Sequence, residues 1–481
     1  MSDINTTTKS HSDKENDFLS SCQRSIRTLV DKHIHILKLM NQEGYRMQFN
    51  LRVIAVFLML VSLSLTGKAL NKELYCFKLD IDPRTYSIQP KYPLSDIDYR
   101  LSPCFKVTYD EHNRIVEVVY LENGKPSNRN PDLSKVVISY SGNEETRSYY
   151  DTWGNPSGKP MGVPVIKIQY DSNHFPVECE NYDRNNHLMK DKKGVMIYRC
   201  KTDAQGRIVA ETFWNEKDQQ VARKDSVYVI KYKWWKDNHL NYNEKSFWNR
   251  NGGLIDSRKH APYELIKYDK EDNLVEFRQM NSDRTLREDS VSVAILHYSL
   301  DDKGLLTEIR YYDAKAKLWD GLQRAAIIRF LFDKYGNMTE RAVYGTDYRL
   351  KKMAGPTIET RKYDDKNKLQ ETAFWDENRN LKETNLKFAK IKNEYDDKGN
   401  LILIKFLNHQ NELVNTLPYG LAYIQCQFDE QNRITKEMYY GVDNSLQPGP
   451  KGEAIIRWIY GKNGAVNVSY YNAKDQKILI K

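Results

Sequence analysis

The sequence predicts an all-β protein: an elongated, solenoid-like array of about twelve β-hairpin repeats that follows an N-terminal signal or anchor helix. Three observations predict this class: a marker that recurs about every 32 residues, turn-forming residues at a fixed distance after it, and alternating apolar and polar residues on both sides. A period kept over most of 481 residues means that each unit packs mainly against its neighbours. We therefore expect a repeat protein and not a compact enzyme domain.

A short marker defines the repeat. It is usually an aromatic residue followed by Asp, and successive markers lie 30 to 33 residues apart. The twelve markers are Tyr109, Tyr140, Tyr170, Thr202, Trp235, Tyr268, Leu300, Phe332, Tyr363, Tyr395, Phe428 and Tyr460. Four residues after most of them stands a residue that tolerates positive φ, at Asn113, Gly206, Gly304, Gly336, Asn367, Gly399, Asn432 and Gly464. Because Asp can hydrogen-bond its own backbone and Gly or Asn can then take the left-handed conformation, each marker predicts a hairpin turn.

The residues on both sides of each turn have the two-residue period of a half-buried strand. Ala389, Ile391 and Tyr395 share one face before a turn, and charged residues alternate with them. The second strand ends in an aromatic pair, such as Phe213-Trp214, Phe247-Trp248 or Phe374-Trp375. Since a single hairpin is only marginally stable, the units must pair edge to edge. They form either one open array or six four-stranded blades of a closed propeller.

The marker turns resemble those of bacterial YD-type repeats, in the broad sense that includes the Rhs-like proteins. The resemblance rests on segments 395–401 (YDDKGNL) and 332–338 (FDKYGNM), and it covers about residues 103 to 475. It implies a scaffold of β-hairpins. The period is longer than in the Rhs type and no separate C-terminal effector domain follows the last repeat, which argues against an Rhs-style toxin shell.

Four segments are expected along the chain: a polar extension over 1–46, a signal peptide or signal anchor over 47–69, a linker or N-terminal cap over 70–102, and the hairpin array over 103–481. The apolar run Val53–Leu65 is short for a membrane span, which needs about 20 residues. Small residues at Gly67 and Ala69 complete a cleavage site that would leave Leu70 as the first residue.

Two interpretations of the N-terminus remain. Translation begins at Met47 and the extension is a mis-assigned start, or it begins at Met1 and the extension is a cytoplasmic tail. In the second case residues 51–66 can stay in the membrane as an uncleaved anchor. We accordingly expect an exported protein, in the periplasm, at the outer surface or secreted, or alternatively one anchored in the inner membrane with its array outside the cytoplasm.

Charge and cysteine content limit the partners. The 74 basic and 65 acidic residues are interleaved and leave a net charge of +9, without a basic block that would follow a phosphate backbone, so no nucleic acid is expected. Cys200 and Cys426 take the same repeat position and are expected to be small core residues. Cys76 and Cys104 flank the start of the array and are candidates for a disulfide.

No catalytic motif, cofactor motif or metal-ligand motif stands in the sequence, so we expect no enzyme and no cofactor. One acidic column recurs eight residues after the markers, at Glu117, Glu178, Glu276, Glu308, Glu340 and Glu371. It is either a cation-binding ladder or, as we favour, an outer face paired with Lys and Arg. The oxygen-rich segment 376–380 resembles the start of a calcium loop, but Leu381 stands where that loop requires Gly.

The aromatic pairs are the candidate binding residues. Adjacent residues of a strand point to opposite faces, so one ring of each pair can enter the core while Trp214, Trp248 or Trp375 faces a ligand. The expected function is that of an exported, non-catalytic scaffold that binds protein or glycan partners at the bacterial cell envelope. The alternatives are an enzyme whose site is assembled between repeats and the structural shell of an Rhs-like secreted protein.

Overall fold

The computed structural model describes residues 72–479, apart from 83, 95–97, 129, 131–132, 160, 238–239, 258–260, 322–323 and 462–465. These residues belong to one structural unit, Asn71–Lys481. The extension over 1–46 and the expected signal or anchor helix over 47–69 lie outside the described residues. Within the described part, no helix is long and apolar enough to cross a membrane.

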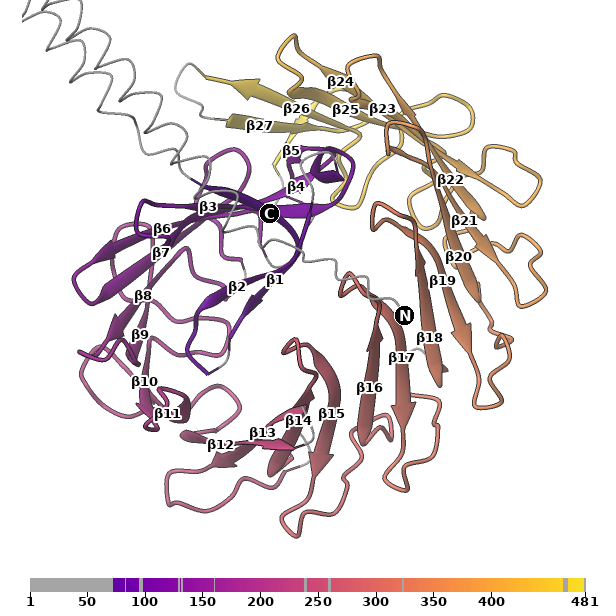
Figure 1. Ribbon diagram of the computed structural model, residues 1–481. Coiled ribbons are helices and arrows are strands. Elements are labelled where there is room, and N and C mark those ends of the chain that lie inside the picture. The colour runs from indigo at the N-terminus through magenta and orange to yellow at the C-terminus, as the bar shows by residue number, and fades with distance from the viewer. Residues whose placement is uncertain are drawn as a thin grey trace, which may run out of the picture. The chain divides into compact units, whose positions relative to one another are not determined.

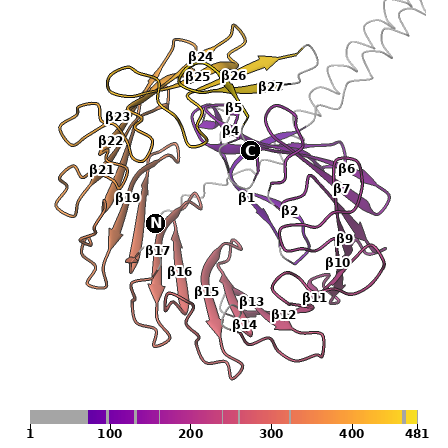
Figure 2. The same cartoon turned by 180° about the vertical axis from the view of Figure 1, so that it is seen from behind.

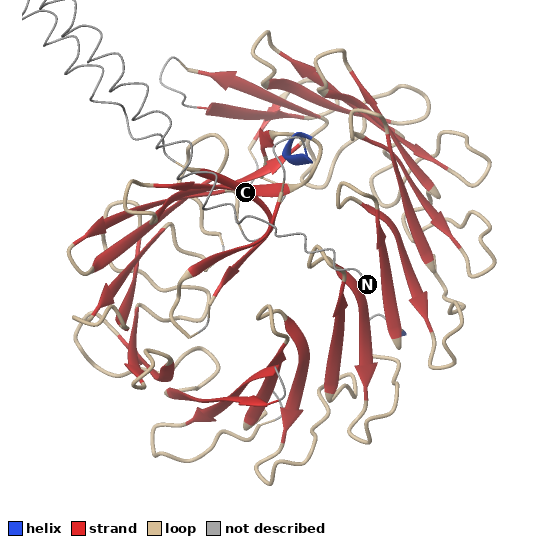
Figure 3. Cartoon of the chain, viewed as in Figure 1, coloured by secondary structure: helices blue, strands red, loops and turns tan. Residues whose placement is uncertain are grey.

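The described chain is all-β, as predicted (Figure 3). Its 28 strands form a single sheet with antiparallel pairing between neighbours, and one short 3-10 turn, η1 (Asp98–Arg100), precedes β3. The strands are β1 (Glu73–Ile81), β2 (Ile88–Pro93), β3 (Cys104–Tyr109), β4 (Ile115–Glu122), β5 (Lys125–Pro126), β6 (Lys135–Ser141), β7 (Glu144–Tyr150), β8 (Val165–Tyr170), β9 (Pro176–Tyr182), β10 (Ile197–Thr202), β11 (Ile208–Trp214), β12 (Val229–Asp237), β13 (Leu240–Trp248), β14 (Tyr263–Tyr268), β15 (Leu274–Met280), β16 (Ile295–Leu300), β17 (Leu306–Tyr312), β18 (Ile327–Phe332), β19 (Met338–Tyr344), β20 (Ile358–Tyr363), β21 (Leu369–Trp375), β22 (Lys390–Tyr395), β23 (Leu401–Leu407), β24 (Tyr423–Phe428), β25 (Ile434–Tyr440), β26 (Ile455–Tyr460), β27 (Val466–Tyr471) and β28 (Lys477–Ile478).

The predicted turns are present. Every marker lies at or near the end of the first strand of a hairpin, from β3–β4 to β26–β27. Seven of the eight predicted turn residues have φ between 59° and 85°, and the eighth, Gly464, lies outside the described residues. The Asp after the marker organises the loop: Asp301 Oδ1 accepts hydrogen bonds from the backbone N–H of Lys303 at 3.0 Å and of Leu305 at 2.8 Å. A bulge accompanies the turn, as between Glu394 and Tyr395.

Successive hairpins share one sheet. The second strand of one unit pairs with the first strand of the next, as Ala210–Thr212 of β11 does with Val229–Lys231 of β12. Blades of a propeller are separate sheets, so the propeller alternative is wrong. The array is nevertheless curved and surrounds β1 and β2 on its concave side (Figures 1 and 2).

The marker tyrosines join neighbouring units. The hydroxyl of Tyr395 donates a hydrogen bond to the carbonyl of Leu369 at 2.9 Å, and that of Tyr460 donates to the carbonyl of Ile434 at 2.8 Å. Tyr140 and Tyr363 make the same bond to the preceding hairpin. In each case the acceptor is the first residue of the preceding unit's second strand. A marker tyrosine thus links its unit to the preceding one by a hydrogen bond.

The two faces of the sheet differ as the alternation predicts. The face that carries Ala389, Ile328 and Phe213 is buried, with Ala389 and Phe213 both 0% exposed. The opposite face carries the second ring of each aromatic pair, such as Trp214. Cys426 is a buried core residue, as expected, and Cys200 is partly buried.

The segment 70–102, which we expected to be a linker or cap, contains the hairpin β1–β2, and β1 pairs with both β2 and β3. This hairpin crosses the concave side and meets marker turns far along the chain. Arg84 binds Asp272, and the carbonyl of Leu101 accepts a hydrogen bond from Asn367. The disulfide suggested for Cys76 and Cys104 is wrong, because both are buried free thiols. Cys76 stands opposite Phe105 in the register of β1 and β3, so Cys104 is offset by one residue and its side chain lies on the other face of the sheet.

Candidate functional site

The three tryptophans singled out in the sequence lie on the face opposite the core, each at the end of its strand. Trp214 ends β11, Trp248 ends β13 and Trp375 ends β21, and all three are partly buried. Their indole N–H groups are already used: that of Trp214 donates to Thr212 Oγ1 at 2.9 Å and that of Trp375 to Thr360 Oγ1 at 2.8 Å. The structure places them in one column and not in one cluster.

Cations cover several rings of this column. The guanidinium of Arg199 lies 4.4 Å from the ring centroid of Trp214, and Lys231 Nζ lies 3.8 Å from that of Trp248. The same arrangement recurs with Tyr182 below Lys167, Tyr344 below Arg329 and Tyr471 below Arg457. The outer face therefore repeats an aromatic–cation pair, which suits contacts with polar, ring-containing or anionic partners.

The acidic column lies on the same face and is paired, as we favoured. Glu308 accepts from Arg310 at 2.5 Å and from Arg329 at 2.6 Å, and is only 8% exposed. The other five are Glu117 with Lys135, Glu178 with Arg199, Glu276 with Arg278, Glu340 with Arg379, and Glu371 with Lys362 and Lys390. Since every carboxylate has a protein cation, a ladder of bound cations is not needed to neutralise them. Among the described residues no group of His, Cys, Asp and Glu is arranged to hold a metal ion.

Two further tryptophans are more exposed than the predicted ones. Trp153 is 60% and Trp319 42% exposed, and both stand in connecting turns outside the strands. We missed them because the aromatic-pair pattern selects strand ends. Both tryptophans stand among turn-forming residues, and this context could have predicted that their rings are exposed.

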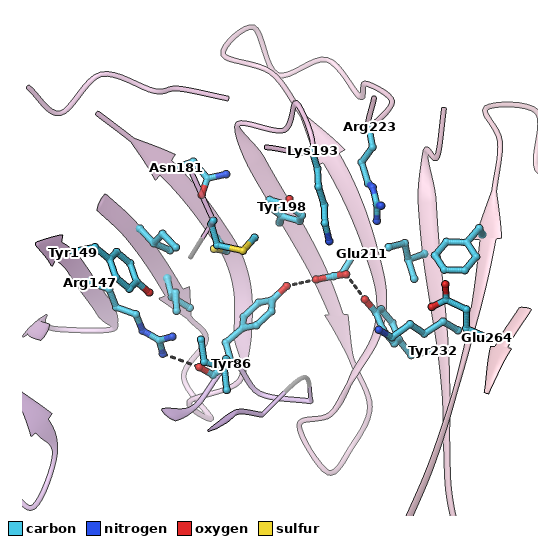
Figure 4. Close-up of a pocket in the computed structure, with 18 residues that line it drawn as sticks. Tyr86, Arg147, Tyr149, Asn181, Lys193, Tyr198, Glu211, Arg223, Tyr232 and Glu264 are labelled. Atoms are coloured by element: carbon cyan, nitrogen blue, oxygen red, sulfur yellow. Dashed lines mark hydrogen bonds between the residues drawn. The ribbon is translucent and has the colours of Figure 1, made fainter. Parts of the chain in front are cut away.

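A cavity of about 470 Å³ opens on the concave face, between the β1–β2 hairpin and the strands β7 to β14 (Figure 4). Apolar side chains lie at two places in its lining: Met161, Ile166 and Ile168 near β8, and the cross-strand pair Ile230 and Phe247 on β12 and β13. The polar wall carries charged and hydroxyl groups from five hairpins and from the tip of β1–β2. This combination of an apolar body and a few convergent polar groups is typical of small-molecule sites.

Glu211 is the centre of the polar wall. Its side chain is 7% exposed and accepts hydrogen bonds from the hydroxyls of Tyr86 and Tyr232, one on each carboxylate oxygen (Figure 4). Burial, followed by the charge of Glu211, raises the pKa of both tyrosines well above the ordinary value, so both remain donors. Tyr86 belongs to the N-terminal hairpin, and its carbonyl accepts from Arg147 at 2.7 Å.

Three further cations line the cavity. Lys193 and Arg223 come from the turns that precede β10 and β12, and Lys245 from β13. Burial, followed by the neighbouring Arg223, lowers the pKa of Lys193. Arg223 donates one bond to Asp225, while its Nε is buried without a partner. Neither Lys193 nor Lys245 has a carboxylate within ion-pair distance among the described residues.

The sequence search did not find this cavity because its residues come from segments far apart in the chain. One signal was present. Glu211 occupies the inward-facing position two residues before Phe213, where some units carry Val118, Cys179 or Ile309 and others carry Arg147, Lys245, Arg341 or Glu437. Charged residues at an inward-facing position indicate polar groups on the inner face.

No protein-family model and no curated sequence matches the chain. Solved structures that align with it include a crystal structure of TcdB2-TccC3-Cdc42, at 12% identity over 83% of this chain and 28% of that one, with a TM-score of 0.15. A Photorhabdus luminescens Tc holotoxin pore aligns at 13% identity over 79% and 24%, with a TM-score of 0.16. A porin-like protein from Bacteroides uniformis aligns at 8% identity over 56% and 94%, with a TM-score of 0.20. The chain spans about a quarter of the two toxin-complex chains, and at these TM-scores the likenesses carry no argument about function.

Proposed function

We propose that this protein is an exported, non-catalytic repeat scaffold that binds protein or glycan partners at the bacterial cell envelope. The observation that supports the proposal most is the recurrence of an aromatic–cation pair at one position of five units, on the face opposite the core. Equivalent surfaces at regular spacing suit an extended partner, because weak contacts along an array add through effective concentration.

The proposal includes membership of the YD-type repeats in the broad sense. Support comes from the marker turn, in which an Asx-type loop, a left-handed Gly or Asn and a bulge recur in the same order. The longer period would then make this chain a variant of that repeat. Its role would be that of a scaffold rather than a toxin shell.

Export rests on the sequence of residues 47–69. We expect the exported product to begin at Leu70, after the Gly67-Lys68-Ala69 boundary. Intact-mass measurement on protein from the native host tests this expectation. A mass that begins at Met1, found in the membrane fraction, would instead indicate the anchored form.

Binding can be tested with an array of bacterial and host glycans and with immobilised envelope proteins. Trp214→Ala is expected to weaken binding of a ligand about two- to fivefold, since one contact among several is lost. Deletion of the four hairpins from β16 to β23 is expected to weaken it much more. Trp319→Ala is the matched control, because that ring is exposed but lies outside the column. A single substitution that abolishes binding while the fold persists would contradict a distributed surface.

The cavity favours a second candidate, an enzyme whose site is assembled between repeats. Glu211, Tyr232 and Lys193 come from three hairpin units and converge there. In that case Glu211→Gln should abolish turnover of a substrate and leave the melting temperature nearly unchanged. Because both oxygens of Glu211 already accept hydrogen bonds from tyrosine hydroxyls, we place this candidate second.

A further inference from the structure

Four cations line the cavity on the concave face. Arg147, Lys193, Arg223 and Lys245 line it, together with two carboxylates, Glu211 and Glu264. Two of the cations have a carboxylate partner: the Nε of Arg147 lies 2.5 Å from Glu145 Oε1, and Arg223 pairs with Asp225. Lys193 and Lys245 have no ion-pair partner among the described contacts.

Three donors at the cavity have no acceptor among the described contacts: the Nζ atoms of Lys193 and Lys245 and the Nε of Arg223. Both oxygens of Glu211 accept tyrosine hydroxyls. Glu264 stands opposite Lys245 in the register of β13 and β14, but no ion pair joins them among the described contacts. The buried Nε of Arg223 likewise has no acceptor, although its guanidinium is only 10% exposed. An unsatisfied buried donor is costly, and a ligand acceptor would remove that cost.

The cations and part of the apolar lining face the same space. Figure 4 shows Lys193 and Arg223 extending into the cavity from the side opposite Tyr86. Ile230 and Phe247 supply apolar surface there, and Phe247 lies on the same strand as Lys245. A volume of about 470 Å³ lies within the range of roughly 300 to 1,000 Å³ that is usual for small-molecule sites.

We propose that this cavity binds a small organic anion with an apolar body, whose acidic head group is held by Lys193, Arg223 and Lys245. Its apolar body lies against Ile230 and Phe247, which face each other in the register of β12 and β13. The site lies apart from the outer aromatic column. The proposal therefore goes beyond the scaffold function and does not depend on it. An anionic head group suits the site better than a cationic one, because Lys193, Lys245 and the Nε of Arg223 are donors without an acceptor, whereas both oxygens of Glu211 already accept a hydroxyl.

The test uses two probes with the same chain length and different head groups, octanoate and 1-octanol, titrated into the native protein by calorimetry. We expect octanoate to bind at least about tenfold more tightly than 1-octanol, since hydrogen bonds to a charged group are the stronger kind. The double variant Lys193→Gln, Lys245→Gln should lose at least about tenfold in octanoate affinity and leave 1-octanol affinity unchanged. Lys231→Gln is the control, because it removes one charge from the outer face, over Trp248.

Three results would overturn the proposal: no octanoate binding by the native protein, equal affinity for the two probes, or equal loss in the Lys231→Gln control. The comparison of the two probes uses only the native protein, so it tests the proposal even if the double variant does not fold. Loss of glycan or protein binding at the outer face would leave this result unaffected. The two sites are thus tested apart.

Discussion

At the residue scale, the tyrosine of the marker donates a hydrogen bond to the preceding hairpin, which its position in the sequence does not predict. The Tyr395 hydroxyl donates to the carbonyl of Leu369 in the preceding hairpin, and Lys368 Nζ lies 5.2 Å from its ring centroid. Markers with Phe or Leu, such as Phe332 and Leu300, keep the apolar contact and lack the donor. The tyrosine thus adds an inter-unit hydrogen bond to an interface that is otherwise made by strand pairing.

The bond can be measured by Tyr395→Phe. We expect the free energy of unfolding to fall by about 1 kcal/mol, the usual net value of one hydrogen bond. The loss should not be larger, because Asn393 Nδ2 still donates to the same carbonyl at 2.9 Å. Urea denaturation measures the change. Tyr348→Phe is the control, since Tyr348 is 53% exposed, and equal effects of the two substitutions would contradict the assignment.

Also at the residue scale, the lowered pKa of Lys193 predicts a pH dependence for octanoate binding. The anion binds the protonated lysine, so affinity should be constant in the neutral range, where octanoate is ionised and Lys193 is protonated, and should fall as pH rises through the lowered pKa. The charged groups that act on Lys193 are Arg223, Lys245, Glu211 and Asp191. In Lys193→Arg the fall should move to higher pH, because arginine stays protonated. Affinity that is constant up to the ordinary lysine value of about 10.4 would contradict the prediction.

At the scale of the element, the hairpin turn is decided locally. Gly399 has φ of 85°, and Lys398 beside it is exposed. Gly399→Val should therefore lower stability by roughly 1–2 kcal/mol or more, and Lys398→Ala should change it little. Thermal denaturation of the two variants is the measurement. Equal melting temperatures would show that the turn register is wrong.

A second comparison separates local strain from contact with the N-terminal hairpin. Gly304 and Gly252 have similar φ, 70° and 74°, but a Cβ at Gly304 would meet the ring of Tyr92 at 2.0 Å while one at Gly252 has open space around it. Both Ala variants pay the same backbone strain. We expect Gly304→Ala to be the more destabilising by at least about 1 kcal/mol, as for overpacking of a filled site. If the two variants melt alike, β1–β2 does not pack tightly against that turn.

At the scale of the whole molecule, the β1–β2 hairpin joins units that lie far apart in the sequence. Its segment contacts Arg147, Ile208, Asp272 and Gly304, and η1 leads to Leu101, which accepts from Asn367. These contacts span most of the array. A sheet with only neighbour contacts would be free to change its curvature, and the hairpin limits that freedom.

Truncation tests this role. A chain that begins at Ser102 should have a larger radius of gyration in small-angle scattering, and a broader melting transition, than a chain that begins at Lys72. The physical reason is that removal of the hairpin leaves an array whose units contact mainly their neighbours, as in other repeat proteins. An unchanged radius and an equally sharp transition would show that the curvature is set by the strands alone.

The sequence by itself determined the repeat. The period, the Asp and Gly or Asn of the marker, and the alternation of residues such as Ala389 and Lys390 act over a few residues, so the twelve hairpins, their turns and their two faces could be predicted. The core position of Cys426 and the ion pairs of the acidic column could be predicted for the same reason. The outward column that holds Trp214 was visible in the pattern, whereas the cations that cover its ring come from the neighbouring strand.

Only the tertiary structure decided what occupies the concave side. Tyr86 and Glu211 are 125 residues apart in the chain, and Lys78 and Asn273 are 195 apart, so no local pattern could place them together. The curvature of one continuous sheet brings the N-terminal hairpin against the marker turns, and the space that remains becomes the cavity lined by Lys193, Arg223 and Lys245. Strand pairing depends on residues of neighbouring units, so it can be predicted from the repeat. The contacts of the N-terminal hairpin join units that are far apart in the sequence, and the repeat period contains no information about such contacts.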